Sequence, residues 1–246
     1  MREPSGAAGL IIGNEVLTAK VRDRNGALLI ERLRARGLAL HGLYVVPDDV
    51  DAIVEALLLA RRRARVIFTS GGIGPTHDDV TVRAVALALN RPIVRMPEIV
   101  ESLTQAFKGK PVPPEALRLA DAPAGSRLIH GPRLQYPALA CDDLYLLPGV
   151  PELFEAQLDT VLDGLPGQPV VTRLVFLDAH EHEIAPVLDA AALEVPEVEI
   201  GSYPTFDPSA GYRVKVTVEH AERARVDAMI ERLVRELPSA SVLRVE

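Results

Sequence analysis

Residues 65–89, RVIFTSGGIGPTHDDVTVRAVALAL, decide the fold of this chain. The stretch opens with a short apolar run at 66–68, typical of a strand buried in a parallel sheet, and closes with apolar residues at helical spacing over 82–89. A glycine-rich turn separates the two. A strand, a glycine turn and a helix in this order place backbone amides at a helix N-terminus, where anions bind. The stretch therefore predicts an α/β fold with a phosphate site at the end of one strand.

The turn holds most of the candidate phosphate ligands. Gly71, Gly72 and Gly74 allow positive φ and a close approach of the backbone, so that several N–H groups can converge on phosphate oxygens. Thr76 adds a hydroxyl donor, and Gly149 lies in a second glycine turn that faces the same edge if the strands are parallel. The predicted phosphate- or nucleotide-binding residues are Thr69, Ser70, Gly71, Gly72, Gly74, Pro75, Thr76 and Gly149.

Two adjacent carboxylates, Asp78 and Asp79, follow the turn, where like charges repel each other. One explanation is structural: one aspartate caps the next helix and the other is a first-turn acid favoured by the helix dipole. The other explanation is a divalent cation, because Mg²⁺ binds one or two protein carboxylates together with phosphate oxygens. Both can hold at once, with one aspartate capping and the other binding metal.

Further acidic residues follow other predicted strands. Glu15 comes after the first strand, and Asp48 comes after a strand at 38–46. Open α/β sheets bind their ligands at such strand ends. The competing interpretation of Asp48 is structural, because Asp48 or Asp49 can cap the helix predicted at 50–63.

The order of the predicted elements indicates two domains. Strands and helices alternate in the first part, including a helix capped by Asn25, which predicts an α/β fold with a mostly parallel sheet and right-handed crossovers. The segment Gly164-Leu-Pro-Gly-Gln-Pro marks the boundary, giving domains at 1–165 and 168–246. The second is a small α+β unit of the order βαββαβ. Its histidine-bearing run at 178–183 matches no zinc pattern and is interpreted as a helix start.

Composition excludes several classes of protein. A net charge of −7 over 246 residues leaves no general basic footprint for nucleic acid. The single cysteine, Cys141, excludes an intramolecular disulfide framework and fits a reducing compartment. The sequence has no apolar run of about 18 residues and no signal-peptide pattern. We expect a cytoplasmic protein with no nucleic-acid and no membrane partner.

The segment TSGGIGPTHDDVT at 69–81 resembles the signature of the molybdopterin-binding, MoaB/MogA-like superfamily, in the form found in the N-terminal domain of CinA, the competence/damage-inducible protein. The GNE turn at Glu15, VVPDD at Asp48 and LLPGVPELF around Gly149 fall in the family's order. The segments QYPALACDDLYLLPGVPELF and EIGSYP are similar to the molybdopterin-binding-like domain of eukaryotic-type FAD synthase, and the small domain to the KH-like domain of CinA. The resemblance implies a three-layer α/β fold with helices on both faces of the sheet.

The resemblance also implies an activity. CinA and the FAD synthase domain are linked in the family to pyrophosphate hydrolysis, of ADP-ribose and FAD respectively. Asp48 and Asp79 match the two acidic positions associated with catalysis in molybdopterin-adenylylating members, and the glycine turn matches their phosphate loop. Those members usually carry a non-acidic residue where this chain has Asp78. An acid at that position favours metal, and hence the hydrolase branch.

We therefore expect a metal-dependent hydrolase of a nucleotide diphosphate linkage. Asp48 and Asp79 are the expected catalytic residues, and Asp78, Asp79 and Glu15 the expected ligands of Mg²⁺, Mn²⁺ or Co²⁺. Two alternatives stay open: adenylyl transfer onto molybdopterin, and a non-catalytic module that binds a nucleotide or a pterin. The family's assemblies imply a homo-oligomer, a dimer or a trimer.

Overall fold

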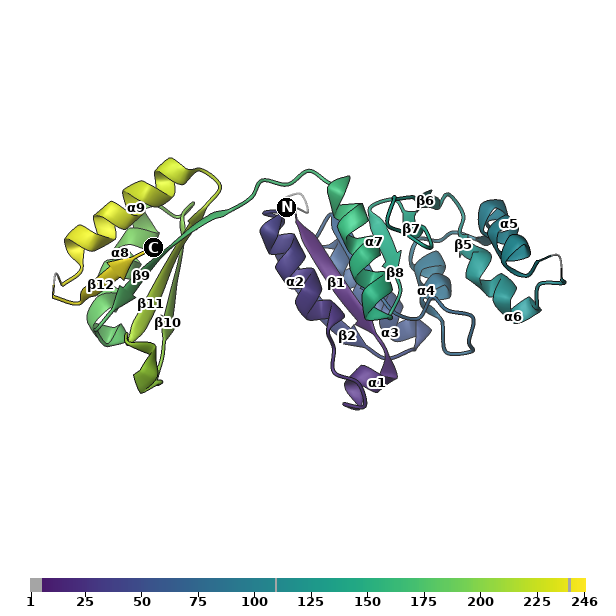
Figure 1. The fold of residues 1–246 in the computed structure, drawn as a ribbon, viewed down its shortest axis with the longest axis horizontal. Coiled ribbons are helices and arrows are strands. Elements are labelled where there is room, and N and C mark those ends of the chain that lie inside the picture. Colours follow the sequence, from purple (N-terminus) through teal and green to yellow (C-terminus); the bar gives the residue numbers. More distant parts are fainter. Residues whose placement is uncertain (1–5, 109, 239) are drawn as a thin grey trace. The chain divides into compact units, whose positions relative to one another are not determined.

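The structure is a computed structural model that describes residues 6–108, 110–238 and 240–246. The chain divides into two compact units, Met1–Gly167 and Gln168–Glu246. Figure 1 shows a separate sheet with its own helices in each unit.

The first unit is built on a mixed sheet. Its strands are β1 (Ala7–Ile12), β2 (Leu40–Val46), β3 (Val66–Ser70), β6 (Arg127–Ile129), β7 (Ala138–Cys141) and β8 (Leu144–Leu147). Within the described residues they lie in the order β2-β1-β3-β8-β7-β6. The pairs β2–β1, β1–β3 and β3–β8 are parallel, which confirms the predicted mostly parallel sheet, whereas β7 and β6 are antiparallel. Those two strands were not predicted, since segments of three and four residues are too short to show a period of two.

Helices cover both faces of this sheet (Figure 1). These are α2 (Asn25–Ala35) and α7 (Pro151–Asp163) on one face and α3 (Val50–Arg61) and α4 (Thr81–Ala88) on the other. The unit also contains α1 (Asn14–Leu17), α5 (Pro97–Ala106), α6 (Pro114–Leu117) and the 3₁₀ turn η1 (Arg118–Ala120). A two-stranded antiparallel ribbon, β4 (Ile93–Arg95) with β5 (Asp121–Pro123), lies in the same unit.

The buried strands separate two apolar layers. Phe68 of β3 packs into a cluster with residues of α2 and α7, while its neighbour Ile67 packs into a second cluster with residues of α3 and α4. In β8, Leu147 belongs to the first of these clusters and Leu146 to the second. Because successive side chains of a strand point to opposite faces, a run that is apolar throughout binds a helix layer on each side. This is the expected three-layer α/β fold.

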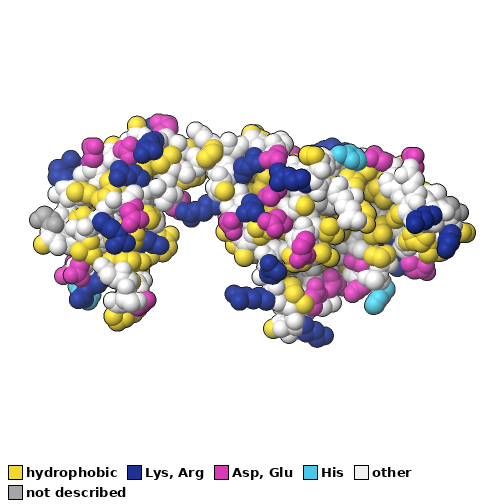
Figure 2. All heavy atoms as spheres, viewed as in Figure 1, with side chains coloured by type: hydrophobic (Ala, Val, Ile, Leu, Met, Phe, Trp, Pro, Cys, Tyr) yellow, Lys and Arg dark blue, Asp and Glu magenta, His cyan; other side chains and the backbone are white. Residues whose placement is uncertain are grey.

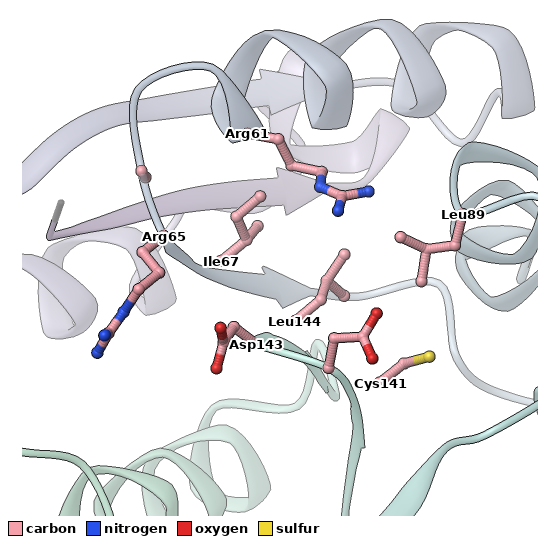
Figure 3. Close-up of a pocket in the computed structure, with 9 residues that line it drawn as sticks. Arg61, Arg65, Ile67, Leu89, Cys141, Asp143 and Leu144 are labelled. Carbon is pink, nitrogen blue, oxygen red and sulfur yellow. The ribbon is translucent and has the colours of Figure 1, made fainter. Parts of the chain in front are cut away.

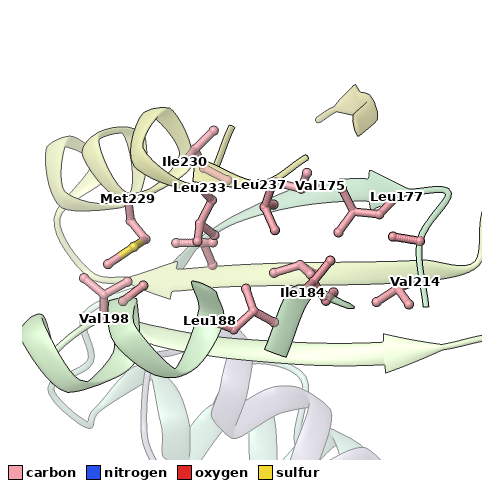
Figure 4. Packing of buried hydrophobic residues seen from close by; sticks show 14 of the residues in the cluster. Val175, Leu177, Ile184, Leu188, Val198, Val214, Met229, Ile230, Leu233 and Leu237 are labelled. Carbon is pink, nitrogen blue, oxygen red and sulfur yellow. The ribbon is translucent and has the colours of Figure 1, made fainter. Parts of the chain in front are cut away.

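The second unit is an antiparallel sheet with two helices. Its strands are β9 (Val171–Leu177), β10 (Glu199–Pro204), β11 (Val214–His220) and β12 (Val242–Val245), and its helices are α8 (Glu181–Glu194), the 3₁₀ turn η2 (Pro208–Ala210) and α9 (Arg223–Glu236). The sheet order is β10-β11-β9-β12, and the chain order is the predicted βαββαβ. Figure 4 shows its core, where Leu188 of α8 and Leu233 of α9 lie in one apolar cluster with Val175 and Leu177 of β9.

No helix in the described part of the chain is long and apolar enough to cross a bilayer.

Candidate functional site

The carboxyl ends of four parallel strands meet at one edge of the first sheet. The amide of Gly13, directly after β1, donates to the carbonyl of Val46 in β2 at 3.1 Å, and the amide of Gly71, directly after β3, donates to the carbonyl of Leu147 in β8 at 3.0 Å. The loops that follow these strands therefore start side by side. Open α/β sheets bind ligands at this kind of edge, and most of the predicted site residues lie here.

The glycine loop after β3 has a backbone that only glycine accommodates at two positions. Gly71 has φ +101°, and a Cβ placed on it would lie 2.3 Å from the carbonyl oxygen of Ile12. Gly72 has φ +67°, and a Cβ there would lie 2.3 Å from Oγ1 of Thr81. The buried Thr81 hydroxyl donates to the carbonyl of Gly71 at 2.8 Å, and its amide donates to Gly72 O at 2.9 Å. The loop is thus held between the end of β1 and the start of α4.

Three consecutive amides of this loop have no acceptor within the described part of the protein. Within the described part of the chain, the N–H groups of Gly72, Ile73 and Gly74 donate no hydrogen bond, whereas those of Gly71 and Thr76 are used by the protein itself. Sequence reasoning missed Ile73, because a backbone donor leaves no trace in the side chain. Unused amides at a strand-to-helix turn are the donors with which such turns bind anions.

The remaining predicted phosphate-binding residues differ in their exposure. Thr69 and Ser70 are buried in β3, so they lie beneath the loop. Pro75 and Thr76 are exposed at its far end. Gly149 is exposed and lies against the glycine loop, since a Cβ on it would be 3.4 Å from Cα of Gly71.

One of the two aspartates after β2 caps a helix, and the other lies at the candidate site. Asp49 caps α3, accepting a hydrogen bond from the amide of Ala52 at 2.9 Å. Asp48 instead accepts a hydrogen bond from the amide of Asn14 at 2.8 Å, which joins the loop after β2 to the loop after β1. Its other carboxylate oxygen, Oδ1, has no partner among the described residues.

Neither Asp78 nor Asp79 caps α4, which corrects one sequence-based interpretation. That helix begins at Thr81 and no side chain caps it. Asp79 instead closes the glycine loop, because its Oδ2 accepts hydrogen bonds from the amide of Thr76, at 2.8 Å, and from the hydroxyl of Thr76. Its Oδ1 has no partner in the described part of the chain. Asp48 and Asp79 are therefore each held by one oxygen and present the other.

The carboxylates at this edge act on one another electrostatically. The pKa of Asp48 is raised, first by burial and then by the negative charges of Glu15, Asp78 and Asp79, against the opposing effect of the Asn14 amide. The pKa of Asp78 is lowered, chiefly by the nearby Thr76 hydroxyl and its own backbone amide. Figure 2 shows acidic side chains gathered over the α1 edge of the first unit, with basic side chains beside them. Carboxylates that raise one another's pKa in this way favour the binding of a cation.

A hard divalent cation fits these donors. Within the described residues, no three His, Cys, Asp or Glu side chains form a ready-made metal site. Mg²⁺ does not need one, since it takes one or two carboxylates and completes its shell with water and substrate phosphates. The free oxygen of Asp79, which closes the loop with the unused amides, is a donor of that type. The metal stays a prediction.

Asn25 has a role that differs from the expected helix cap. It is the first residue of α2, and Asp23 accepts a hydrogen bond from the amide of Gly26 at 3.0 Å in its place. The side-chain nitrogen of Asn25 donates to Oγ of Ser70 at 2.8 Å and to the carbonyl of Gly149 at 2.9 Å. It therefore ties the end of β3 to the loop after β8. The sequence could not predict this link between the two loops, because the position of Asn25 fits a helix cap equally well.

Two other features carry no predicted site residue. A pocket of about 380 Å³ lies at the opposite edge of the sheet, lined among others by Arg65 before β3 and Asp143 before β8 (Figure 3). The run at 178–183 starts α8: the amide of His180 donates to Glu183 at 2.6 Å in a capping box, as the helix-start interpretation predicts.

Fold and site together define an α/β protein with a glycine phosphate loop and acidic residues at the carboxyl edge of a parallel sheet. Residues 8–185 match the family model described as a probable molybdopterin binding domain, and residues 169–246 match the middle domain of FAD synthase. The chain belongs to the family of molybdopterin-binding domains, in its CinA-like form.

Relatives of two kinds share this combination. A putative competence-damage inducible protein of Moorella thermoacetica is 33% identical over 94% of this chain and 58% of its own length. A probable FAD synthase of Caenorhabditis elegans is 28% identical over 96% of this chain and 50% of its own. The chain thus spans 58% of the first of these two relatives and half of the second. A crystal structure of CinA from Thermoplasma acidophilum, described as of unknown function, is 28% identical and matches with a TM-score of 0.62, over 66% of this chain and 99% of that one.

Proposed function

We propose that this protein hydrolyses a diphosphate linkage in a nucleotide-like substrate such as FAD or ADP-ribose, with a divalent cation. The proposal depends on one observation, which is that unused loop amides and carboxylates lie at the same edge of the sheet. Three unused amides, of Gly72, Ile73 and Gly74, lie in a loop closed by Asp79, at the edge where Asp48 interacts with other carboxylates. A phosphate needs hydrogen-bond donors such as the loop amides, and a cation needs carboxylates. A diphosphate with its metal ion needs both.

The chain's own residues can be given roles in this reaction. Asp78, Asp79 and Glu15 would hold the cation, which when bound would neutralise phosphate charge and make phosphorus more electrophilic. The loop amides would stabilise negative charge that develops on the phosphoryl oxygens. Asp48, whose raised pKa makes it a better proton acceptor, would take the proton from the attacking water. The new bond joins the water oxygen to phosphorus, and the bridging oxygen leaves with the second phosphate.

The test is product analysis by chromatography. The full chain is incubated separately with FAD and with ADP-ribose, each with Mg²⁺, Mn²⁺ or Co²⁺ and with EDTA as the control. Metal-dependent formation of AMP with FMN, or of AMP with ribose 5-phosphate, supports the proposal and names the substrate. Intact substrates under every condition contradict it.

Asp48→Asn gives the matched variant. Asparagine keeps an acceptor for the Asn14 amide but removes the charge and the proton acceptor, so the fold should persist and turnover should be lost. Asp49→Asn is the control, because Asp49 caps α3 and asparagine is an equally good cap. Equal turnover in the two variants would remove Asp48 from the mechanism.

Adenylyl transfer onto molybdopterin is the second candidate, and the family match supports it. Here ATP is the donor: the new phosphoanhydride forms between AMP and the pterin phosphate, and pyrophosphate leaves. Incubation with ATP and molybdopterin would then yield an adenylylated pterin with pyrophosphate release. Tight binding without any product would identify a binding module instead.

A further inference from the structure

The sheet of the second unit has two outer strands, and they differ in regularity. Within the described residues the strand order is β10-β11-β9-β12, so β10 and β12 each have one side without a neighbouring strand (Figure 1). The strand β12 has four residues, and its register with β9 shifts between Val242 and Arg244. The strand β10 pairs with β11 over all six of its residues without a shift. A regular open edge is a template for a further strand, whereas a short irregular edge is not. Of the two, β10 is therefore the strand suited to pair with another chain.

The register of β10 shows which of its backbone groups face the open side. Directly after the paired residues, the amide of Thr205 donates to the carbonyl of Arg213 at 2.8 Å. In an antiparallel pair only every second residue exchanges hydrogen bonds with a given neighbouring strand. Counting back from Thr205 in steps of two, the bonding residues of β10 leave the amides and carbonyls of Ile200 and Ser202 directed to the open side. A strand added at this edge would bond to these two residues.

A groove runs beside the same edge. It is a pocket of about 500 Å³ between β10 and α8, and Ile200 and Ser202 line it from the strand. Buried Leu188 and half-buried Ala185 line it from the helix, so part of the wall is apolar. The short alanine side chain leaves room for an apolar side chain of a ligand. An open strand edge beside such a pocket is a recurring site for extended peptides, because the main chain supplies affinity and the pocket selects side chains.

The remaining polar lining of the groove is acidic. Glu181, His182 and Asp189 of α8 are exposed there, and the described lining contains no Lys or Arg. Asp189 has no hydrogen bond or ion pair within the described residues, and Glu181 accepts a hydrogen bond from the hydroxyl of Ser202 at 2.7 Å. A second copy of this chain adding its own β10 would bring the same carboxylates against these, and like charges repel. A segment with basic side chains would instead be attracted to them.

We propose that the groove between α8 and β10 binds an extended, basic segment of a partner protein, which pairs as an additional strand with β10. An apolar side chain of the segment lies against Ala185, Leu188 and Ile200, and flanking Lys or Arg side chains pair with Glu181 and Asp189. The site lies within the second unit, so it is independent of the function proposed for the first.

The test is a titration of the full chain with short peptides, followed by the amide resonances in NMR spectra. The probes are Arg-Thr-Val-Thr-Arg-Thr and its analogues with Ala or Leu in place of Val, in which alternate residues can face the groove. We expect at least one of them to bind and to shift the amide resonances of Ile200 and Ser202. The charge-reversed peptide Glu-Thr-Val-Thr-Glu-Thr should leave these resonances in place.

Methylated peptides test the strand pairing itself. In an added strand only alternate amides face β10. Methylation of the Val amide is therefore compared with methylation of the amide that follows it. One of the two should weaken binding about three- to ten-fold, the value of one net hydrogen bond, and the other should leave it unchanged. Equal affinity of the two methylated peptides would overturn the proposal.

A pair of charge variants tests the acidic lining. Asp189→Lys should weaken binding of the basic peptide about two- to ten-fold, because it replaces an attraction with a repulsion. Glu231→Lys is the matched control: it changes the net charge equally, but Glu231 is an exposed residue of α9 and does not line the groove. Equal weakening by the two variants would show attraction to the charge of the whole protein and would overturn the proposal.

Two further results would also overturn it. One is the absence of binding by all three basic peptides up to about 1 mM, the weak end of measurable affinity. The other is a shift of the Ile200 and Ser202 resonances with protein concentration in the absence of peptide, which would identify a second copy of the chain as the occupant.

Discussion

Replacing Gly71 with alanine tests how the phosphate loop is held. The residue has φ +101° and a Cβ would lie 2.3 Å from the carbonyl oxygen of Ile12, which belongs to the backbone of β1 and cannot rotate away. An L-residue forced into positive φ costs about 1–2 kcal/mol. Overpacking against a rigid neighbour adds about 1–3 kcal/mol. The expected loss of stability is therefore about 2–5 kcal/mol.

Differential scanning calorimetry of the full chain measures this loss. For a protein of this size 1 kcal/mol shifts Tm by about 2–4 °C, so a loss of about 3 kcal/mol lowers Tm by roughly 6–12 °C. Gly164→Ala is the matched control, because Gly164 has φ −89° and a Cβ there would meet its nearest neighbour, the carbonyl oxygen of Val161, at 3.5 Å. It should stay within about 0.5 kcal/mol of wild type. Equal melting of the two variants would refute the steric and conformational reasoning.

Two further predictions concern the candidate site, and a third concerns the apolar core of the second unit. In metal-free buffer the raised pKa of Asp48 means that the folded state holds the proton of this carboxyl more tightly than the unfolded state, so stability falls as pH rises through the folded-state pKa. Urea unfolding at a series of pH values should show Asp48→Asn to be more stable than wild type above that pKa, and the opposite order would refute the linkage argument. Asp79→Asn should lose turnover yet keep its fold, whereas Asp79→Ala should also lose about 1 kcal/mol in urea unfolding because the Thr76 amide and hydroxyl lose their acceptor; equal stability would contradict the loop contact. Leu233→Ala should cost about 2–5 kcal/mol in the same assay, against a small effect of Val234→Ala, since Leu233 is fully buried and Val234 is 38% exposed; similar losses would argue against the described core.

Much of the fold could be predicted because its signals are local. The β3 segment opens with the apolar run at 66–68 and two helix layers cover it, and such a run predicts a buried parallel strand directly. The helices α7 and α9 begin and end as their periodicity indicates. The strands β6 and β7 escaped prediction because they are short and paired by tertiary contact.

The candidate site shows the same division. Glycines in a strand-to-helix turn predict a phosphate loop, because positive φ is a property of the residue itself. Whether a carboxylate caps a helix or faces a ligand is a property of its surroundings. Asp48 and Asp49 are adjacent and chemically identical, yet one caps α3 and the other joins two loops.

The sequence by itself determined the alternation of strands and helices, the glycine loop and the acidic strand ends, because each depends on residues within a few positions of one another. Only the tertiary structure decided which amides of the loop are free, that Asp79 closes the loop, and that Asn25 spans from α2 to the ends of β3 and β8. Those contacts join residues up to 124 positions apart. A hydrogen bond depends on where two atoms meet in space, and the packing of distant segments sets that position.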